Sequence, residues 1–533
     1  MDFAKCTTRL RTNVLSDKNK KMLDKFIETI NQGYQFKGES IILGGAMLDN
    51  KTQTGTLVKL PLKMLNRHGL IAGATGSGKT KTLQIIAEQL SEVGVPSLLM
   101  DIKGDLSGIA VASAGHAKID ERHAAIGIPF RASGSPVELL TISKEKGVRM
   151  RATVSEFGPV LFSKILELND TQSGIVAIIF KYCDDNALPL LDLADFKKAL
   201  QYMSGEGKAE VQELYGLISS SSVGSMMRKI VELEQQGAEV FFGERSFDVA
   251  DLCRVDANGR GIVSVIRLTD IQDRPKLFST FMLQILAEIY TTFPEAGDLD
   301  KPKLVLFIDE AHLVFDQASS ALMNQLEAIV KLIRSKGVGI FFVTQNPADV
   351  PDSVLGQLGL KIQHSLRAFT AKDRKAIKLA AQNYPLTDFY DVEQLLTELG
   401  IGEALVTSLN EKGIPTPLVH TMLRAPESRM DVLTPAEIDD LVKRSALVKK
   451  YNDVVDRNSA HDILSKKIES AQAVERQEEL QAQQAKATKA APRRQEKSMM
   501  EKVMSNTTTR QIGRTLAREL ARGLFGILGG KRR

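Results

Sequence analysis

The run from Leu70 to Thr80, LIAGATGSGKT, constrains this chain more than any other part of its sequence. It contains the spacing Gly73-x-x-x-x-Gly78-Lys79-Thr80. In this pattern glycines let backbone N–H groups surround a polyphosphate, the lysine reaches the β- and γ-phosphates, and the threonine hydroxyl binds Mg²⁺. An apolar run precedes the loop, and apolar residues at helical spacing follow it. The sequence therefore predicts a strand, a phosphate-binding loop and a helix.

Length and composition bound the remaining possibilities. The chain has 533 residues, which is too long for one core and predicts two or three domains. No stretch approaches the roughly 20 apolar residues that cross a bilayer, and the N-terminal residues have no apolar signal core. Three scattered cysteines form neither a metal cluster nor a disulfide framework. These features predict a cytoplasmic protein.

Two later strand ends supply carboxylates. Leu304–Ile308 is uniformly apolar, which indicates a buried parallel strand, and it delivers Asp309 and Glu310 at its end. In a phosphate-loop enzyme the first carboxylate belongs to the Mg²⁺ shell, and an adjacent one activates the attacking water. Asp101 follows another apolar run, where it either faces the ligand or caps a turn. The sequence thus predicts Thr80 and Asp309 as metal ligands and Glu310 as the catalytic carboxylate.

Further polar residues flank the strand GVGIFFVTQNP. Gln345 ends this strand, where its amide either senses the γ-phosphate and attacking water or caps the loop. Arg334 ends the helix before the strand, where it either supplies positive charge to a neighbour's nucleotide or interacts with its own helix dipole. Arg67 lies just before the strand that leads into the phosphate loop.

At these residues the chain resembles a known family. GATGSGKT, the lone Asp101, LVLFIDEAH and VTQNP resemble, in order and spacing, the HerA/FtsK group of ring-forming P-loop ATPases. The runs LPLKMLNRHGLIAGATGSGKT and VRMRATVSEFGPVL are similar to bacterial HerA-like proteins of the YjgR type. The resemblance implies ATP and Mg²⁺ as ligands, and a homo-oligomeric ring, a hexamer, with ATP sites between subunits. It also implies that Arg67 and Arg334 complete the site.

The residues expected at the site divide by role. The expected catalytic residues are Glu310, Gln345, Arg334 and Arg67. The expected nucleotide-binding residues are Gly73, Ala74, Thr75, Gly76, Ser77, Gly78, Lys79, Thr80, Lys81 and Asp101.

The fold implied by the resemblance is α/β, a RecA-type P-loop NTPase core with a mostly parallel sheet and helices on both faces. Archaeal members carry a full N-terminal β-barrel, for which only a short stretch is available in this chain. The expected organisation is an N-terminal helix and small β element (1–60), the ATPase core (61–106 and 257–424), a mainly helical insertion (107–256), a helical or partly disordered extension (425–505) and a basic amphipathic tail (506–533).

The charge distribution leaves the function open. The whole chain carries +5, but residues 508–533 alone carry +6, which leaves −1 for the remainder. The tail suits nucleic acid, an anionic membrane surface or a partner groove, or it folds back on the body. Two interpretations remain, a motor that moves along duplex DNA and an ATP-driven switch or scaffold that acts on a protein or membrane. A small-molecule kinase is disfavoured, because Glu310 beside Asp309 suits water activation better.

Overall fold

The computed structural model describes residues 20–315, 320–453, 455 and 457–489. The chain divides into two units, the first ending at Lys466 and the second beginning at Lys467. The first unit contains the whole sheet, and the described part of the second belongs to helix α17 (Ala460–Lys489). The basic tail predicted for 506–533 lies outside the described residues.

A single mixed sheet of twelve strands forms the framework of the first unit, in the order β2-β1-β12-β11-β10-β3-β9-β8-β4-β7-β5-β6. The strands are β1 (Ser40–Leu48), β2 (Lys51–Pro61), β3 (Gly69–Ala72), β4 (Ser97–Asp101), β5 (Val137–Thr141), β6 (Val148–Arg149), β7 (Val263–Arg267), β8 (Leu304–Ile308), β9 (Val338–Thr344), β10 (Leu360–Gln363), β11 (Glu403–Thr407) and β12 (Val419–Leu423).

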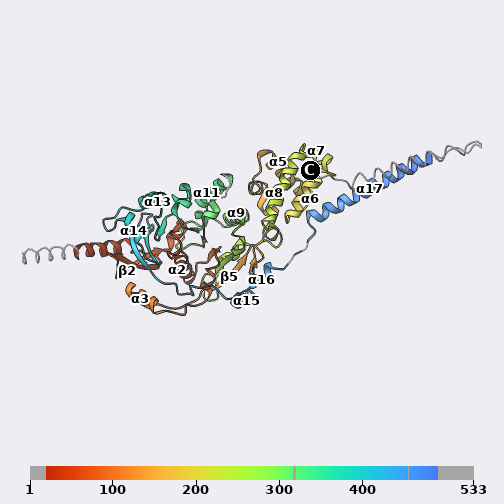
Figure 1. Cartoon of the computed structure of the whole chain (residues 1–533). Helices are drawn as coiled ribbons and strands as arrows, with labels where there is room; N and C mark the ends of the chain where they lie inside the picture. The colour runs from red at the N-terminus through yellow and green to blue at the C-terminus, as the bar shows by residue number, and fades with distance from the viewer. Residues whose placement is uncertain (1–19, 316–319, 454, 456, 490–533) are drawn as a thin grey trace, which may run out of the picture. The chain divides into compact units, whose positions relative to one another are not determined.

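Helices fill most of the connections between these strands (Figure 1). A helix over residues 20–33 precedes β1. The others before α17 are α2 (Lys79–Glu92), α3 (Ala117–Ile126), α4 (Val154–Ile165), α5 (Asp170–Asp185), α6 (Leu193–Ser204), α7 (Lys208–Tyr215), α8 (Ser220–Gln235), α9 (Pro275–Thr292), α10 (His312–Phe315), α11 (Ser320–Ile333), α12 (Asp352–Leu355), α13 (Ala371–Gln382), α14 (Val392–Glu398), α15 (Pro435–Arg444) and α16 (Ala446–Tyr451). Within the described ranges, no helix combines the length and apolar character that crossing a membrane requires.

The central strands are parallel, and their register brings their carboxyl ends to one edge. Every neighbouring pair from β10 through β3, β9, β8, β4, β7 and β5 to β6 is parallel. Ala72 of β3 is in register with Thr344 of β9, and Ile308 of β8 with Met100 of β4. The segments that follow β3, β9, β8 and β4 therefore meet at the same edge, which is where ligands bind in open α/β sheets.

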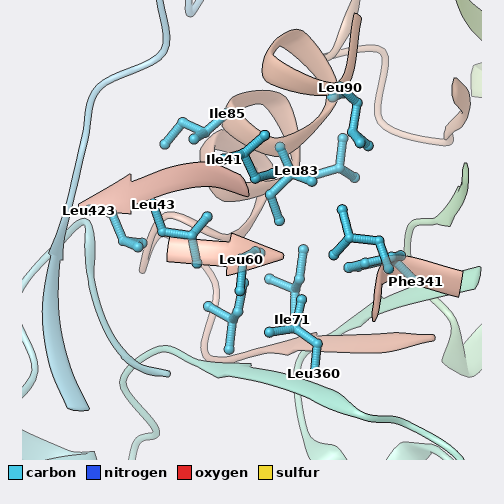
Figure 2. Packing of buried hydrophobic residues seen from close by; sticks show 14 of the residues in the cluster. Ile41, Leu43, Leu60, Ile71, Leu83, Ile85, Leu90, Phe341, Leu360 and Leu423 are labelled. Carbon is cyan, nitrogen blue, oxygen red and sulfur yellow. The ribbon is translucent and has the colours of Figure 1, made fainter. Parts of the chain in front are cut away.

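Helices cover both faces of the sheet. Successive residues of a strand point to opposite faces. Phe341 of β9 packs with Leu83 and Leu90 of α2 in the apolar cluster of Figure 2. On the opposite face Phe342 stacks against Phe315 of α10, with ring centroids 5.4 Å apart. The α/β class and the mostly parallel sheet predicted from the sequence are confirmed.

The structure adds two details to the expected organisation. Strands β5 and β6 lie within 107–256, the range predicted to be mainly helical, and extend the sheet beside β7. β6 has only two residues, too few to show a periodicity. The hairpin of β1 and β2 joins the same sheet, because Gly45 pairs with Met422 of β12. Gly44 permits this approach, since a Cβ there would lie 1.9 Å from the Met422 carbonyl oxygen.

Candidate nucleotide-binding site

The predicted phosphate loop connects β3 to α2 and is tied to the neighbouring strand ends. The N–H of Gly73 donates to the Thr344 carbonyl at 3.2 Å, and the N–H of Ala74 donates to the Ser365 carbonyl at 2.8 Å. The Ser77 carbonyl accepts from Gly402 N–H at 3.0 Å. The loop is therefore anchored on β9 and on the segments that follow β10 and precede β11.

Two glycines of the loop adopt conformations that a side chain would disturb. Gly73 has φ +154°, and a Cβ there would lie 2.5 Å from the His364 Cβ. Gly78 has φ +114°, and its Cβ would lie 3.3 Å from the Gly402 nitrogen. These are the positions that the motif reserves for glycine.

Lys79 points its ammonium group into the curve of the loop. Nζ donates to the Gly73 carbonyl at 2.8 Å and to the Ala74 carbonyl at 3.3 Å. Burial lowers the pKa of Lys79, and the Glu310 carboxylate opposes this shift. The ammonium group therefore lies between the phosphate loop and the acidic end of β8.

The other predicted loop residues differ in placement. Thr75 and Gly76 are exposed at the tip, and Thr80 is half-buried in the first turn of α2. Lys81 is also a predicted nucleotide-binding residue, and its Nζ donates to the Met430 carbonyl at 2.6 Å. In this structure Lys81 therefore ties α2 to the chain after β12.

Asp309 presents a free carboxylate oxygen beside the loop. Its Oδ1 accepts from Glu310 N–H at 2.9 Å, whereas Oδ2 is buried and has no hydrogen-bond partner among the described residues. Burial, helped by the Glu310 charge, raises its pKa to about 6. A buried carboxylate oxygen with free lone pairs fits a hard cation such as Mg²⁺.

No cluster of three or more His, Cys, Asp or Glu side chains suited to a metal occurs in the part of the chain that the structure describes. Mg²⁺ commonly takes one or two protein ligands, with its other ligands from phosphate and water. Thr80 and Asp309 are the two residues that would hold Mg²⁺ at this site.

Glu310 is buried between two basic side chains. Lys103 Nζ contacts its Oε1, and His312 Nδ1 lies 3.3 Å from its Oε2. Burial raises the pKa of Glu310, but the Lys103 ammonium outweighs it and holds that pKa below the usual value. Glu310 also has a left-handed backbone, φ +47°, uncommon for a residue with a side chain. Its carboxylate is thus fixed at the end of β8.

Asp101 holds a turn. Its Oδ1 accepts from the N–H groups of Gly104 at 2.7 Å and Asp105 at 3.1 Å, and its Oδ2 accepts from Leu106 at 3.2 Å. Burial raises its pKa to about 7. Of the two interpretations of Asp101, the hydrogen bonds favour the turn cap, and the turn that it caps carries Lys103.

The predicted catalytic residues divide between the two edges of the sheet. Gln345 follows Thr344, whose carbonyl holds Gly73, so it lies beside the loop with an exposed side chain. Arg67 and Arg334 precede β3 and β9, at the amino edge. The seven residues of β9 separate that edge from Gln345 by roughly 20 Å. The structure therefore does not bring the arginines together with the phosphate loop of the same chain.

Both arginines line a basic cavity of about 540 Å³, whose lining includes Arg67, His68, Lys331, Arg334 and Lys361. No carboxylate is among the described residues that line it. The nearby Asp298 pairs with Lys63 at 2.8 Å.

His68 anchors the wall of this cavity. Its Nδ1 accepts from Ile340 N–H at 3.0 Å, so its Nε2 donates to the Val330 carbonyl at 2.9 Å. The hydrogen bonds connect the segment before β3 to α11 and β9.

Sequence reasoning missed Lys103 and His312 at the acidic edge, and Lys331 and Lys361 in the basic cavity. Lys103 lies two residues after Asp101 in the run DIKGD, and His312 two residues after Glu310. Their closeness in sequence to Asp101 and Glu310 is the feature that could have identified them. Lys361 had none, because its position depends on the pairing of β10 with β3.

Most of the chain is similar in sequence to a known protein family. The family described as "Helicase HerA-like C-terminal" matches residues 46–533. The DNA double-strand break repair helicases HerA of Sulfolobus acidocaldarius and Saccharolobus solfataricus are each 24% identical to this chain, over 67% and 66% of it. The alignments span 66% and 63% of those two relatives, less than two thirds of their length.

Among solved structures, VirB4 of Thermoanaerobacter pseudethanolicus matches 75% of this chain and 99% of its own, with TM-score 0.47 and 16% identity. The bacterial conjugative coupling protein TrwB matches 76% of this chain and 94% of its own, with TM-score 0.47 and 14% identity. The family match extends over most of the chain, including the phosphate loop and both acidic strand ends. The chain therefore belongs to the HerA-like helicase C-terminal family of P-loop proteins.

Proposed function

We propose that this protein is a Mg²⁺-dependent ATPase whose active site is completed by a neighbouring copy of the chain. The observation that carries the proposal is the convergence of Lys79, Asp309 and Glu310 at the carboxyl edge of the parallel sheet. This set supplies positive charge for phosphate, an oxygen ligand for a metal and a base for water.

Each residue has a distinct role in this proposal. Lys79 binds the β- and γ-phosphates, and Thr80 and Asp309 hold Mg²⁺, which neutralises charge on the phosphate oxygens. Glu310 accepts the proton of the attacking water. Gln345, beside the loop at the end of β9, orients that water or the γ-phosphate.

The basic cavity supports a shared site. A ring of identical subunits uses heterologous contacts, in which one surface of a subunit meets a different surface of the next. Arg67 and Arg334 lie at the edge opposite the loop, so in such a ring they can face a neighbour's nucleotide. We propose a hexamer in which these arginines stabilise the charge that develops on the γ-phosphate.

Duplex DNA is the proposed substrate of the motor. The curated relatives are named as DNA repair helicases, and the chain shares their family. A second candidate is an ATP-driven switch that acts on a protein or membrane surface. The near-neutral charge of the chain before residue 508 favours that alternative.

Steady-state ATPase turnover with and without duplex DNA, at two salt concentrations, separates the two candidates. A DNA motor is stimulated by duplex, and the stimulation falls as salt rises because phosphate contacts release counterions. The Glu310→Gln variant controls for contaminating ATPases. Turnover that duplex DNA leaves unchanged at both salt concentrations supports the switch instead.

A further inference from the structure

Lys103 lies at the active-site edge on a hydrogen-bonded turn and has a partly exposed side chain. The Asp101 carboxylate accepts from three backbone N–H groups of this turn. The Lys103 side chain is 42% exposed, and its ammonium group contacts Oε1 of Glu310. The backbone position is therefore set while the long side chain keeps access to solvent.

Lys103 also lies close to the phosphate-binding lysine. Its positive charge lowers the pKa of Lys79, and both lysines lower the pKa of Glu310. The two ammonium groups approach Glu310 from different elements, Lys79 from the start of α2 and Lys103 from the turn after β4. A γ-phosphate held by Lys79 near Glu310 is consequently within the electrostatic influence of Lys103.

We propose that Lys103 is a second phosphate-binding lysine of the same subunit, which exchanges the Glu310 carboxylate for the γ-phosphate of ATP. The inference rests on the proposed ATPase function and adds a residue to it. In the structure Lys79 donates to the carbonyls of Gly73 and Ala74, and Lys103 contacts Glu310. Both lysines thus hold acceptors that phosphate oxygens can replace.

The exchange has a consequence for the catalytic carboxylate. Lys103 engages one oxygen of Glu310 and His312 lies beside the other. A carboxylate oxygen bound to an ammonium group is a weaker proton acceptor than a free one. Transfer of Lys103 to the γ-phosphate frees Oε1 for the attacking water. ADP has no γ-phosphate, so it leaves the contact between Lys103 and Glu310 in place.

Nucleotide affinity measured by calorimetry tests the inference without turnover. The probes are the Mg²⁺ complexes of a non-hydrolysable ATP analogue with an imido bridge and of ADP. Lys103→Met is expected to weaken binding of the ATP analogue roughly tenfold, which is the magnitude of one charge-assisted hydrogen bond. The affinity for ADP should not change. Lys103→Arg should restore most of the preference, because it keeps the charge. Lys144→Met, at an exposed lysine just after β5, is the matched control.

A double-mutant cycle separates direct phosphate binding from general electrostatics. Glu310→Gln removes the carboxylate that competes with phosphate for Lys103. The substitution should therefore increase the affinity for the ATP analogue when Lys103 is present. This gain should vanish in the Lys103→Met background. A gain of equal size in both backgrounds would overturn the exchange, as would an unchanged preference for the ATP analogue over ADP in Lys103→Met. Failure of the wild-type chain to bind either nucleotide would instead overturn the proposed ATPase function, and this inference with it.

Discussion

The Thr344 carbonyl at the end of β9 accepts the N–H of Gly73, the first glycine of the phosphate loop, at 3.2 Å. One strand therefore touches the loop directly at its carboxyl end, where Gln345 follows. The same strand begins four residues after Arg334, which lies in the wall of the basic cavity at the opposite edge. β9 thus connects the site of one subunit to the surface that we propose serves the next.

Lys79→Ala should weaken ATP binding by a factor of about 100 or more, because two charge-assisted phosphate contacts are lost. Equilibrium binding of a fluorescent ATP analogue measures the loss. Lys81→Ala is the control from the same helix turn, since the Lys81 ammonium donates to Met430. Equal losses in the two variants would contradict the assignment of the phosphate lysine.

Asp101→Ala should lower the free energy of unfolding by about 2 kcal/mol, because three N–H groups lose their acceptor. Urea denaturation measures this change. ADP affinity should stay close to that of the wild type, since Asp101 faces its own turn. An Asp101→Ala variant with unaltered stability but lost Mg²⁺-nucleotide binding would show that Asp101 is a ligand.

Stability should fall as the pH drops from about 6.5 to 4, in part through His68. Burial lowers the pKa of His68 to about 4, so the folded chain resists a proton that the unfolded chain accepts near its ordinary pKa. The contribution of His68 to the free energy of unfolding is fully present above pH 6.5. Roughly 2–3 kcal/mol of it is lost by pH 4.

Urea unfolding at several pH values, compared between wild type and His68→Asn, isolates this contribution. The variant should be less stable than the wild type at pH 7, because asparagine cannot make both hydrogen bonds that the His68 ring makes. Its free energy of unfolding should also depend less on pH. Parallel pH curves for the two proteins would show that His68 does not titrate on unfolding.

Mixing Arg334→Ala chains with Glu310→Gln chains should restore ATPase activity that neither has alone. In a randomly mixed ring, roughly a quarter of the interfaces join an intact glutamate to an intact arginine. Turnover after confirmed subunit exchange is the readout, and Arg67→Ala is tested in the same way. Mixtures that stay as inactive as the separate variants would show that these arginines do not complete a neighbour's site.

The sequence predicted the parts of the fold that local chemistry determines. Glycine spacing identified the phosphate loop, and the uniform apolar run Leu304–Ile308 identified a buried strand that ends in Asp309 and Glu310. What it could not predict depends on long-range pairing. β5 is a short strand that pairs with β7, and the two-residue β6 pairs in turn with β5. The β1–β2 hairpin joins the sheet where Gly44, Gly45 and Ala46 pair with β12.

The site shows the same division. Lys103 is unremarkable in sequence, and its position against Glu310 arises from the parallel pairing of β4 with β8. The sequence leaves two interpretations of Asp101 open, and the hydrogen bonds of its turn favour the turn cap. The position of Arg334 before a strand makes it a candidate from sequence, but only the three-dimensional arrangement shows that it lines a cavity together with Arg67.

Glu310→Gln tests the central claim most directly, because it separates ATP binding from ATP hydrolysis. The amide is nearly isosteric with the carboxylate but cannot accept the proton of the attacking water. ATP affinity and steady-state turnover are measured on the same preparation, with wild type and Lys79→Ala in parallel. The account predicts that Glu310→Gln retains ATP while turnover falls by at least about 100-fold. Turnover at the wild-type rate in this variant would contradict the account.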